Sequence, residues 1–488
     1  MKTRTALLGS LAVTVALAGA GAAAIAPAAA APVAAPPGFR DVMWVGNNWA
    51  GTATVVDEES LEVLKSGVNL IPDKAQELRD IRLSPVRLVL FALVRQLPGE
   101  GHDQFVDDMF MTPDGTHLAV SRPSFGDVVW IDVAKATSTG GPDSITREQS
   151  MDGYRTDHMA VSPDGRRLLV SDSTKRQVLE YSMVDETVGS TEIKMGDRLR
   201  TFVSGETPHE SNYTADGERI LHASIGRVYT PLDDTDPVDG RLLGVPLTRL
   251  GISRFRLDKL VAKLPWDVLD EAVKADRWLQ YVDTDTFEVL ERWDMKHELA
   301  EAGFPGMSSA VRPVALHPDG RRLYLQVSFL HGYVEFDTEA ADLNGTTDYT
   351  VGTKSEPGRG AVTGVVQLEN RVPGMPYEQY VNDSAHHGIA ISEDGETLCV
   401  AGTMDNYAAL VDADTGAAQY FDARTTGMKY GKPYWVTEGL GDTCWVSLSD
   451  NDAVAVLSTE TKKQLAYLPV GNHPQRVRHG YVDSGLLP

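Results

Sequence analysis

A turn built on Asp-Gly recurs five times along this chain of 488 residues, each time between two apolar, strand-like segments. The copies are centred on Asp114, Asp164, Asp216, Asp319 and Asp394. Asp can hydrogen-bond its own backbone and Gly accepts a positive φ, so each copy predicts a β-hairpin. The intervals between the Asp residues are 50, 52, 103 and 75 residues, which indicates a unit of about fifty residues interrupted by insertions.

The segments that follow these turns also repeat. Further strand patterns occupy residues 126–133, 177–183, 278–284, 332–338 and 407–413, and a weaker unit without the turn covers residues 434–456. Each unit therefore has the strands of one four-stranded meander. Meanders repeated at this period predict an all-β chain folded as a β-propeller, in which each unit forms one blade.

The two ends of the repeat region complement one another. Residues 41–65 contain the second, third and fourth strands of a unit, and residues 469–483 contain a first strand alone. Joining them completes a blade and leaves no open sheet edge. Six whole units and one shared unit predict seven blades. The interval of 103 residues has room for an eighth, which is the alternative.

Two segments carry a resemblance to a known family. Residues 386–395 read HHGIAISEDG and residues 157–165 read DHMAVSPDG. Both are similar to the repeat signature of the YVTN family of secreted seven-bladed β-propellers, and the resemblance covers residues 40–483 apart from two long inserts. Propellers of this kind act as lactonases, as copper or quinone enzyme domains and as binding platforms, and those like the nitrous-oxide-reductase propeller hold copper through channel histidines. The resemblance therefore implies the fold and leaves the activity open.

Residues 1–31 have the pattern of a secretory signal peptide. Lys2 and Arg4 precede an apolar stretch at 6–25, and a run of alanines comes before a Pro/Ala spacer at 32–40. We expect cleavage near Ala30 or Ala31 and a secreted, extracellular protein with one domain at 41–483 and a tail at 484–488. The alternative is an uncleaved anchor helix. No other segment approaches the length of a membrane span.

Composition narrows the classes of partner. The chain carries 69 Asp and Glu against 45 Lys and Arg, a formal net charge of -24, which argues against binding a nucleic-acid backbone. A closed ring of blades removes one common reason to dimerise, so we expect a monomer.

Cys399 and Cys444 lie in equivalent strands of successive units but one residue out of register, so their side chains should face opposite ways. We expect two buried free thiols rather than a disulfide.

The histidines and the inserts gather at one end of the predicted propeller. The Asp-Gly turns mark the bottom, and eight of the twelve histidines fall in connections at the other end or at its rim. Inserts at 68–105, 226–277 and 369–385 belong to that same top end. The first should contain a helix that begins at Pro85 with Ser84 as its N-cap, and the second reads as helical at about 257–275. We expect the inserts at 68–105 and 226–277 to form a lid over the central channel, or alternatively a decoration of the rim or a partner surface.

Residues just before the innermost strands should face the channel axis. The candidate metal ligands there are His158, His209, His386, His387 and His473, and the candidate catalytic residues are Asp157, His209, Glu210 and Arg312. Imidazole suits a transition metal such as copper, and a carboxylate also suits calcium.

Three functions are compatible with such a ring of polar residues. The first is a metal site, which could support copper-type oxidoreductase chemistry. The second is lactonase-like hydrolysis with a His base, a carboxylate and Arg312 as an anion-binding group. The third is a platform that binds a small molecule or a protein without catalysis. The working prediction is a lidded top-face pocket for a small molecule or metal ion, with the two enzyme classes as alternatives and the enzyme question open.

Overall fold

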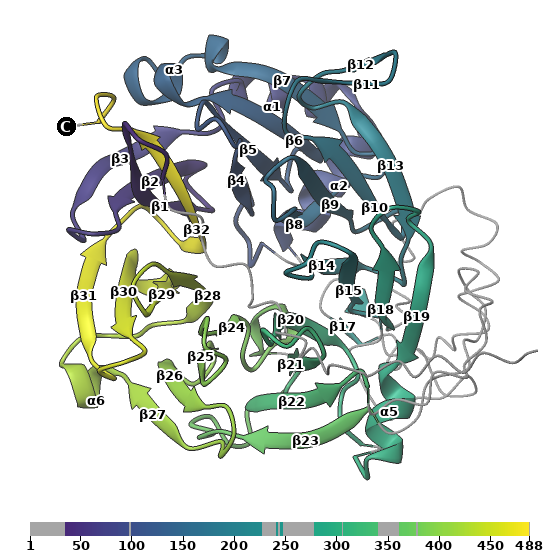
Figure 1. The fold of residues 1–488 in the computed structure, drawn as a ribbon, viewed down its shortest axis with the longest axis vertical. Helices are drawn as coiled ribbons and strands as arrows, with labels where there is room; N and C mark the ends of the chain where they lie inside the picture. Colours follow the sequence, from purple (N-terminus) through teal and green to yellow (C-terminus); the bar gives the residue numbers. More distant parts are fainter. Residues whose placement is uncertain are drawn as a thin grey trace, which may run out of the picture.

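Seven four-stranded antiparallel sheets form a ring in the computed structural model of this protein (Figure 1). The structure describes residues 35–96, 99–226, 241–242, 245–246, 278–304, 306–339, 361–376 and 379–487. The predicted seven-bladed β-propeller is confirmed. In the described part of the interval between Asp216 and Asp319 every four-stranded ladder belongs to blade 4 or blade 5, so there is no eighth blade among these residues.

The first blade joins the two ends of the chain, as predicted. Its strands β1 (Phe39–Asn47), β2 (Thr52–Asp57), β3 (Val63–Asn69) and β32 (Pro474–Asp483) pair in the order β3-β2-β1-β32, with β32 innermost. Phe39 pairs with Asp483, and the register continues to Asn47 opposite Pro474. Figure 1 shows β32 beside β1, close to the C-terminus.

The other six blades follow in chain order, each from its innermost to its outermost strand. Blade 2 comprises β4 (Met109–Met111), β5 (His117–Arg122), β6 (Asp127–Asp132) and β7 (Ile145–Ser150), and blade 3 comprises β8 (Thr156–Val161), β9 (Arg167–Asp172), β10 (Gln177–Ser182) and β13 (Arg198–Val203). Blade 4 comprises β14 (Pro208–Tyr213), β15 (Arg219–Ser224), β18 (Trp278–Asp283) and β19 (Val289–Asp294), and blade 5 comprises β20 (Val311–Leu316), β21 (Arg322–Val327), β22 (Gly332–Asp337) and β23 (Val362–Gln367). Blade 6 comprises β24 (Ile389–Ile391), β25 (Thr397–Gly402), β26 (Tyr407–Asp412) and β27 (Ala418–Phe421), and blade 7 comprises β28 (Pro433–Gly439), β29 (Thr443–Leu448), β30 (Ala453–Ser458) and β31 (Gln464–Pro469).

The remaining described elements are short and lie in connections. Two-stranded ladders pair β11 (Glu186–Val188) with β12 (Thr191–Ile193) and β16 (Arg241–Leu242) with β17 (Val245–Pro246). The helices are α1 (Lys74–Leu83), α2 (Pro85–Gln96), α3 (Val133–Ser138), α5 (Met295–Glu301) and α6 (Ala423–Thr426), with 3-10 turns η1 (Pro142–Ser144), η5 (Val381–Asp383) and η6 (Ser449–Asn451). Among the described helices none has the length and apolar character needed to cross a membrane.

The Asp-Gly turns behave as their residues predict. In all five, the Gly has a positive φ, from +68° at Gly115 to +76° at Gly395. In each, the Asp side chain accepts a hydrogen bond from the backbone N–H two residues on, as Asp114 does from Thr116 at 3.0 Å. The turns therefore fix the register between the first and second strands of their blades.

The apolar core lies mainly between neighbouring blades. One cluster joins Tyr324 and Tyr333 of blade 5 to Leu398 and Val400 of blade 6, and another joins Ala401 of blade 6 to residues of blade 7. Strand residues alternate between the two faces of a blade, so both faces of each blade contribute to the packing. This packing explains why the strand patterns are apolar on both faces rather than alternating cleanly with polar residues.

The prediction of free thiols is wrong. Cys399 of β25 and Cys444 of β29 form a disulfide that links blades 6 and 7, with their Cα atoms 6.5 Å apart. The two side chains do leave opposite faces of their own blades. In a ring, however, the forward face of one blade packs against the rear face of the next, and both cysteines lie in the cluster between blades 6 and 7. Opposite faces of successive blades are therefore the faces that meet.

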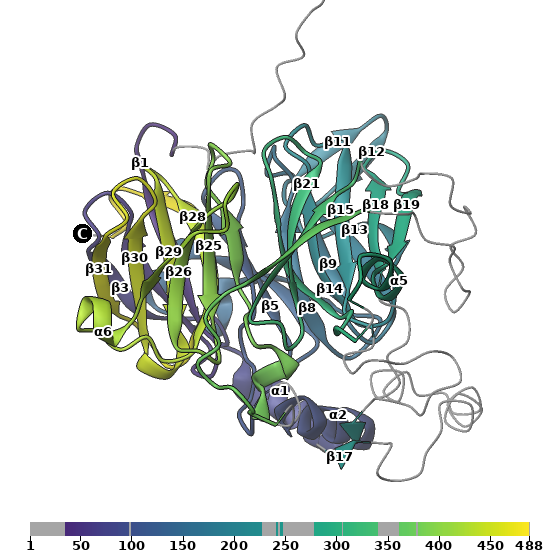
Figure 2. The same cartoon turned by 90° about the horizontal axis from the view of Figure 1, so that it is seen from below.

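The insert that follows blade 1 contains two helices, where the sequence analysis predicted one. Helix α2 begins at Pro85 as predicted, with the Arg87 N–H donating to Ser84 Oγ at 3.4 Å, and α1 precedes it. Arg122 of blade 2 anchors the insert through Asp73 at 2.6 Å, and Glu100 pairs with Lys432 at the entry to blade 7 at 2.9 Å. Figure 2 shows α1 and α2 on one face of the ring. The predicted helix at 257–275 lies outside the described residues.

Candidate functional site

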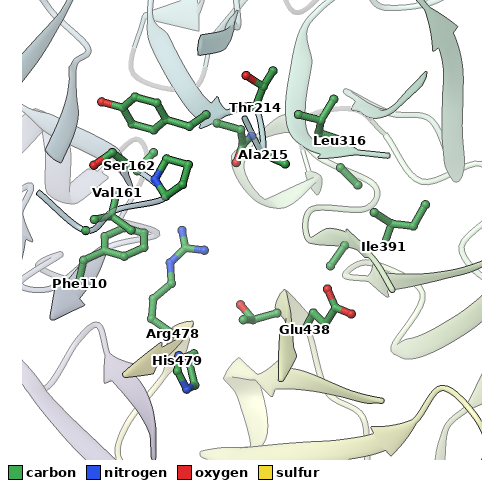
Figure 3. Close-up of a pocket in the computed structure, with 18 of the residues that line it drawn as sticks. Phe110, Val161, Ser162, Thr214, Ala215, Leu316, Ile391, Glu438, Arg478 and His479 are labelled. Carbon is green, nitrogen blue, oxygen red and sulfur yellow. The ribbon is translucent and has the colours of Figure 1, made fainter. Parts of the chain in front are cut away.

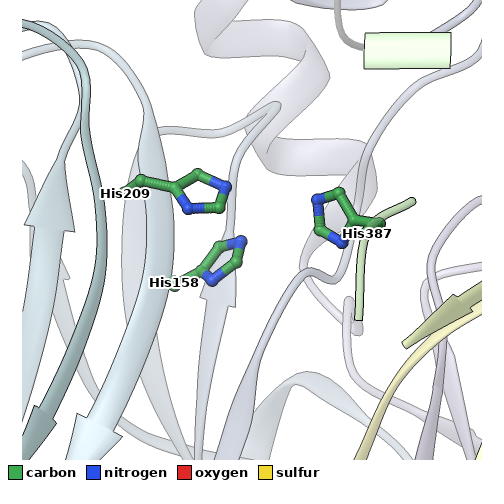
Figure 4. A group of neighbouring side chains, drawn as sticks. All are labelled: His158, His209 and His387. Carbon is green, nitrogen blue, oxygen red and sulfur yellow. The ribbon is translucent and has the colours of Figure 1, made fainter. Parts of the chain in front are cut away.

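Three imidazoles converge where the innermost strands of blades 3, 4 and 6 begin. The ring centroids of His158 and His209 are 4.0 Å apart, and His387 lies 6.1 Å from His158 and 5.9 Å from His209. One nitrogen from each ring lies within 4.8 Å of the others. All three side chains are buried, with 2–3% of their surface exposed. Figure 4 shows His158 and His209 side by side, with His387 opposite them.

The backbone places these side chains by leaving the sheet ladder. The pairing of β8 with β9 skips from Thr156 to Met159, and that of β14 with β15 skips from Pro208 to Glu210. Comparable shifts occur in three further blades, around Arg312, Tyr434 and Arg476. A bulge re-aims the side chains that it releases from the ladder. The polar ring predicted from the spacing to the Asp-Gly turns therefore consists of residues outside the regular hydrogen-bonded register.

The environment keeps the three imidazoles neutral. Burial lowers the pKa of His158, His209 and His387 well below its usual value. Nearby cations lower it further, chiefly Arg476 for His158 and both Arg312 and Arg476 for His387. A neutral imidazole is the form that binds a metal. Within the described residues, the Nδ1 atoms of all three rings are buried and have no hydrogen-bond partner.

Charged groups surround the three rings. Arg476 donates a hydrogen bond to His158 Nε2, lies 3.4 Å from Asp107 Oδ1 and stacks 4.0 Å from the Trp435 ring. Glu210 Oε2 lies 3.8 Å from His158 Nδ1. Burial raises the pKa of Glu210 to about 7 and that of Asp107 to about 6. A further cation placed among these carboxylates would favour their ionised forms.

Asp157 and Arg312 lie beside the rings without forming part of the triad. Asp157 Oδ1 is 3.6 Å from His158 Nε2, while its other oxygen pairs with Arg155 at 3.2 Å and accepts from Ser173 at 2.8 Å. The Arg312 Nε donates to Ser328 Oγ at 2.8 Å. Both are therefore held by other groups and supply charge to the site.

The structure places His386 and His473 in other clusters. His386 Nε2 contacts Asp405 Oδ2 at 2.8 Å, and His331 Nδ1 contacts the same oxygen at 2.6 Å. The ring of His473 stacks on that of Trp49, with the two ring centroids 3.6 Å apart. Neighbouring residues of an extended segment point opposite ways, so of His386 and His387 only one could face the axis. The sequence therefore contains the signal that separates these two histidines, whereas no sequence pattern joins Asp405 and His331 to His386.

A cavity of about 780 Å³ lies at the opposite end of the channel from the one predicted to hold a pocket. It opens among the Asp-Gly turns and reaches inward to Met159, Glu210 and Val314. Figure 3 shows Arg478 and Glu438 projecting into it. Met159 and Glu210 directly follow His158 and His209, so the cavity ends one residue layer from the triad.

Comparisons with known proteins bear on the fold alone. No family model and no curated protein matches the chain, so the resemblance to the YVTN family stays a prediction. Similar solved structures include hydrazine synthase from Kuenenia stuttgartiensis, at 12% identity over 80% of this chain and 97% of that chain with a TM-score of 0.47. Virginiamycin B lyase from Staphylococcus aureus matches at 11% identity over 74% of this chain and 83% of that chain, with a TM-score of 0.43. The β-propeller domain of Myceliophteria thermophila Cps50 (Swd1) matches at 10% identity over 75% of this chain and 86% of that chain, with a TM-score of 0.44.

Proposed function

We propose that this propeller binds one transition-metal ion through His158, His209 and His387. The observation that carries the proposal is the convergence of three buried, neutral imidazoles from three different blades, with one nitrogen of each within 4.8 Å of the others. Two nitrogens bonded to one metal at about 2 Å lie at most about 4 Å apart, so small side-chain rotations would bring the three nitrogens into bonding positions. Imidazole donors favour copper or zinc over calcium, which takes oxygen ligands.

Three histidine ligands leave room for a further ligand. Catalytic zinc sites use the same number of protein ligands and keep a position for water or substrate. Glu210 and Asp107 are the nearby carboxylates whose raised pKa shows that burial disfavours their charge. They support a cation at this place because its charge would offset the cost of ionising them.

Metal binding is tested on protein purified without an affinity tag. We expect elemental analysis after dialysis against copper or zinc to find one ion per chain, and calorimetric titration to give a single site. His209→Ala and His387→Ala should each weaken binding by more than the roughly 10–100-fold that loss of an outer-shell partner costs. His297→Ala, on the exposed face of α5, and His386→Ala, in the neighbouring cluster, are the matched controls. Unchanged metal content in both triad variants would refute the proposal.

Arg476 should oppose metal binding. Its guanidinium donates to a nitrogen of His158 and brings positive charge to the site, so a metal must displace it or bind against its field. Arg476→Met removes that competition. A hydrogen bond to a charged group contributes about 1.5–3 kcal/mol, so we expect the metal to bind about tenfold or more tightly in this variant. Arg322→Met, at the other end of the propeller, serves as the control, and weaker binding in Arg476→Met would contradict the prediction.

We further propose that the protein is secreted. The signal-like pattern at residues 1–31 supports this, and so does the disulfide between Cys399 and Cys444, because disulfides persist in oxidising compartments.

A further inference from the structure

The cavity at the Asp-Gly end has the size of a small-molecule site and is lined by both apolar and charged side chains. Its volume of about 780 Å³ falls within the range of roughly 300–1,000 Å³ that such sites occupy. Apolar side chains from several blades line its wall, among them Phe110, Val161, Leu316 and Ile391 (Figure 3). An apolar group of several carbon atoms would be desolvated against these residues.

Two opposite charges project into this cavity from adjacent innermost strands. Arg478 belongs to β32 and Glu438 to β28, and the two strands lie side by side in blades 1 and 7. The pair is too far apart to form a salt bridge, since none joins them among the ion pairs of the described residues. Figure 3 shows both side chains projecting into the cavity.

Each of the two side chains has one polar atom that makes no hydrogen bond with the described residues. Arg478 donates from Nε and Nη2 to Asp108, at 2.8 and 2.7 Å, and its Nη1 has no hydrogen-bond partner among the described side chains and backbone. Glu438 Oε1 accepts from the Glu393 N–H at 2.5 Å, and within the described part of the chain Oε2 accepts nothing. The aromatic rings of Phe110 and Trp435, 4.8 and 4.9 Å from the guanidinium, hold Arg478 in place.

The electrostatics of Glu438 favour an incoming cation. Burial raises its pKa to about 7, with smaller contributions in the same direction from the neighbouring carboxylates Glu393, Asp394 and Asp442. The backbone hydrogen bond from Glu393 offsets only part of this. An ammonium group near Oε2 would relieve the repulsion, while Nη1 of Arg478 remains available for an anionic oxygen.

We propose that this cavity binds a small zwitterion with an apolar side chain, of the class of the free α-amino acids. Its carboxylate is bound by Arg478, its ammonium by Glu438, and its side chain by the apolar wall. The site is distinct from the histidine triad, and the proposal does not depend on a metal.

Calorimetric titration of the full chain with leucine and two analogues tests the charge requirement. Leucinamide keeps the ammonium without the carboxylate, and 4-methylpentanoate keeps the carboxylate without the ammonium. We expect leucine to bind at least tenfold more tightly than either analogue. Leucyl-leucine separates the two charges, so tighter binding of the dipeptide would support a peptide as the source of the same zwitterionic chemistry.

Two variants make the test specific to this cavity. Glu438→Gln should bind leucine and 4-methylpentanoate equally, because only the partner of the ammonium is lost. Glu396→Gln, a change at an exposed residue of the same turn that does not line the cavity, should retain the preference of the unmodified protein. Binding of leucine that is unchanged in Glu438→Gln, equal affinity for all three compounds, or no binding of any of them would each overturn the proposal.

Discussion

Deleting residues 474–488 should abolish folding of this protein. The deletion removes β32, the innermost strand of blade 1, which pairs with β1 along its length and contributes the fully buried Val477 and Val482. It also leaves Asp108 buried without Arg478, to which it is joined by two hydrogen bonds. Removing one partner of a buried ion pair typically costs about 3–5 kcal/mol, a large part of the stability of a folded domain. We expect the truncated chain to be recovered insoluble, or soluble without the near-ultraviolet circular dichroism of the intact protein.

A circular permutant separates closure of the ring from the position of the chain ends. Linking residue 487 to residue 35 with a short flexible segment and opening the chain at the exposed turn around Asp414 keeps every strand of the seven blades. This permutant should fold with the circular dichroism spectrum of the intact protein. A folded truncation, or an unfolded permutant despite its complete set of strands, would contradict the role assigned to the shared blade.

Loss of the disulfide between blades 6 and 7 should destabilise the protein by about 2–4 kcal/mol. The bond closes a loop with a sequence separation of 45 residues, for which the chain-entropy model gives about 4 kcal/mol at 25 °C. Both cysteines lie in the apolar cluster between the two blades, so the double variant Cys399→Ala, Cys444→Ala also loses some packing. The free energy of unfolding in guanidinium chloride measures the effect.

Reduction of the unmodified protein is the control for that variant. Reduction should cause a somewhat smaller loss than the double variant, because it removes the same cross-link and keeps both sulfur atoms in the apolar cluster. Mass spectrometry of the protein before reduction should find the bond formed. Equal stability of oxidised and reduced protein would show that the link between the blades adds nothing to the fold.

Much of the architecture could be predicted because it rests on local chemistry. Asp-Gly turns specify hairpins through the residues within them, and the complementary strand patterns at the two ends specify the shared blade. The disulfide could not be predicted from the register within one blade, since it depends on which faces of successive blades meet. Helix α1 was missed although Asp73, a residue type common at helix N-caps, stands at its start. The Asp73 side chain does not cap the helix and instead pairs with Arg122.

The candidate site could be predicted only in part. Spacing from the turns identified the positions that face the axis, and three of the five histidines do converge there. His473 lies in a stack with Trp49, and His386 points to Asp405, because the direction of each side chain depends on local backbone geometry and neighbouring loops. The cavity among the Asp-Gly turns was not predicted, because it is bounded by the strand ends and turns themselves rather than by the inserts. The pocket expected at the other end stays a prediction.

The shifts in register at the beginnings of the innermost strands have a consequence for how this protein could change. Side chains such as those of His158, His209 and Arg312 lie at positions that the sheet ladders bypass, while the neighbouring residues on either side keep the blades paired. Exchanging such residues for others of similar volume alters the chemistry at the axis and leaves the main-chain frame in place. The same scaffold could thus acquire different ligand sets through a few substitutions.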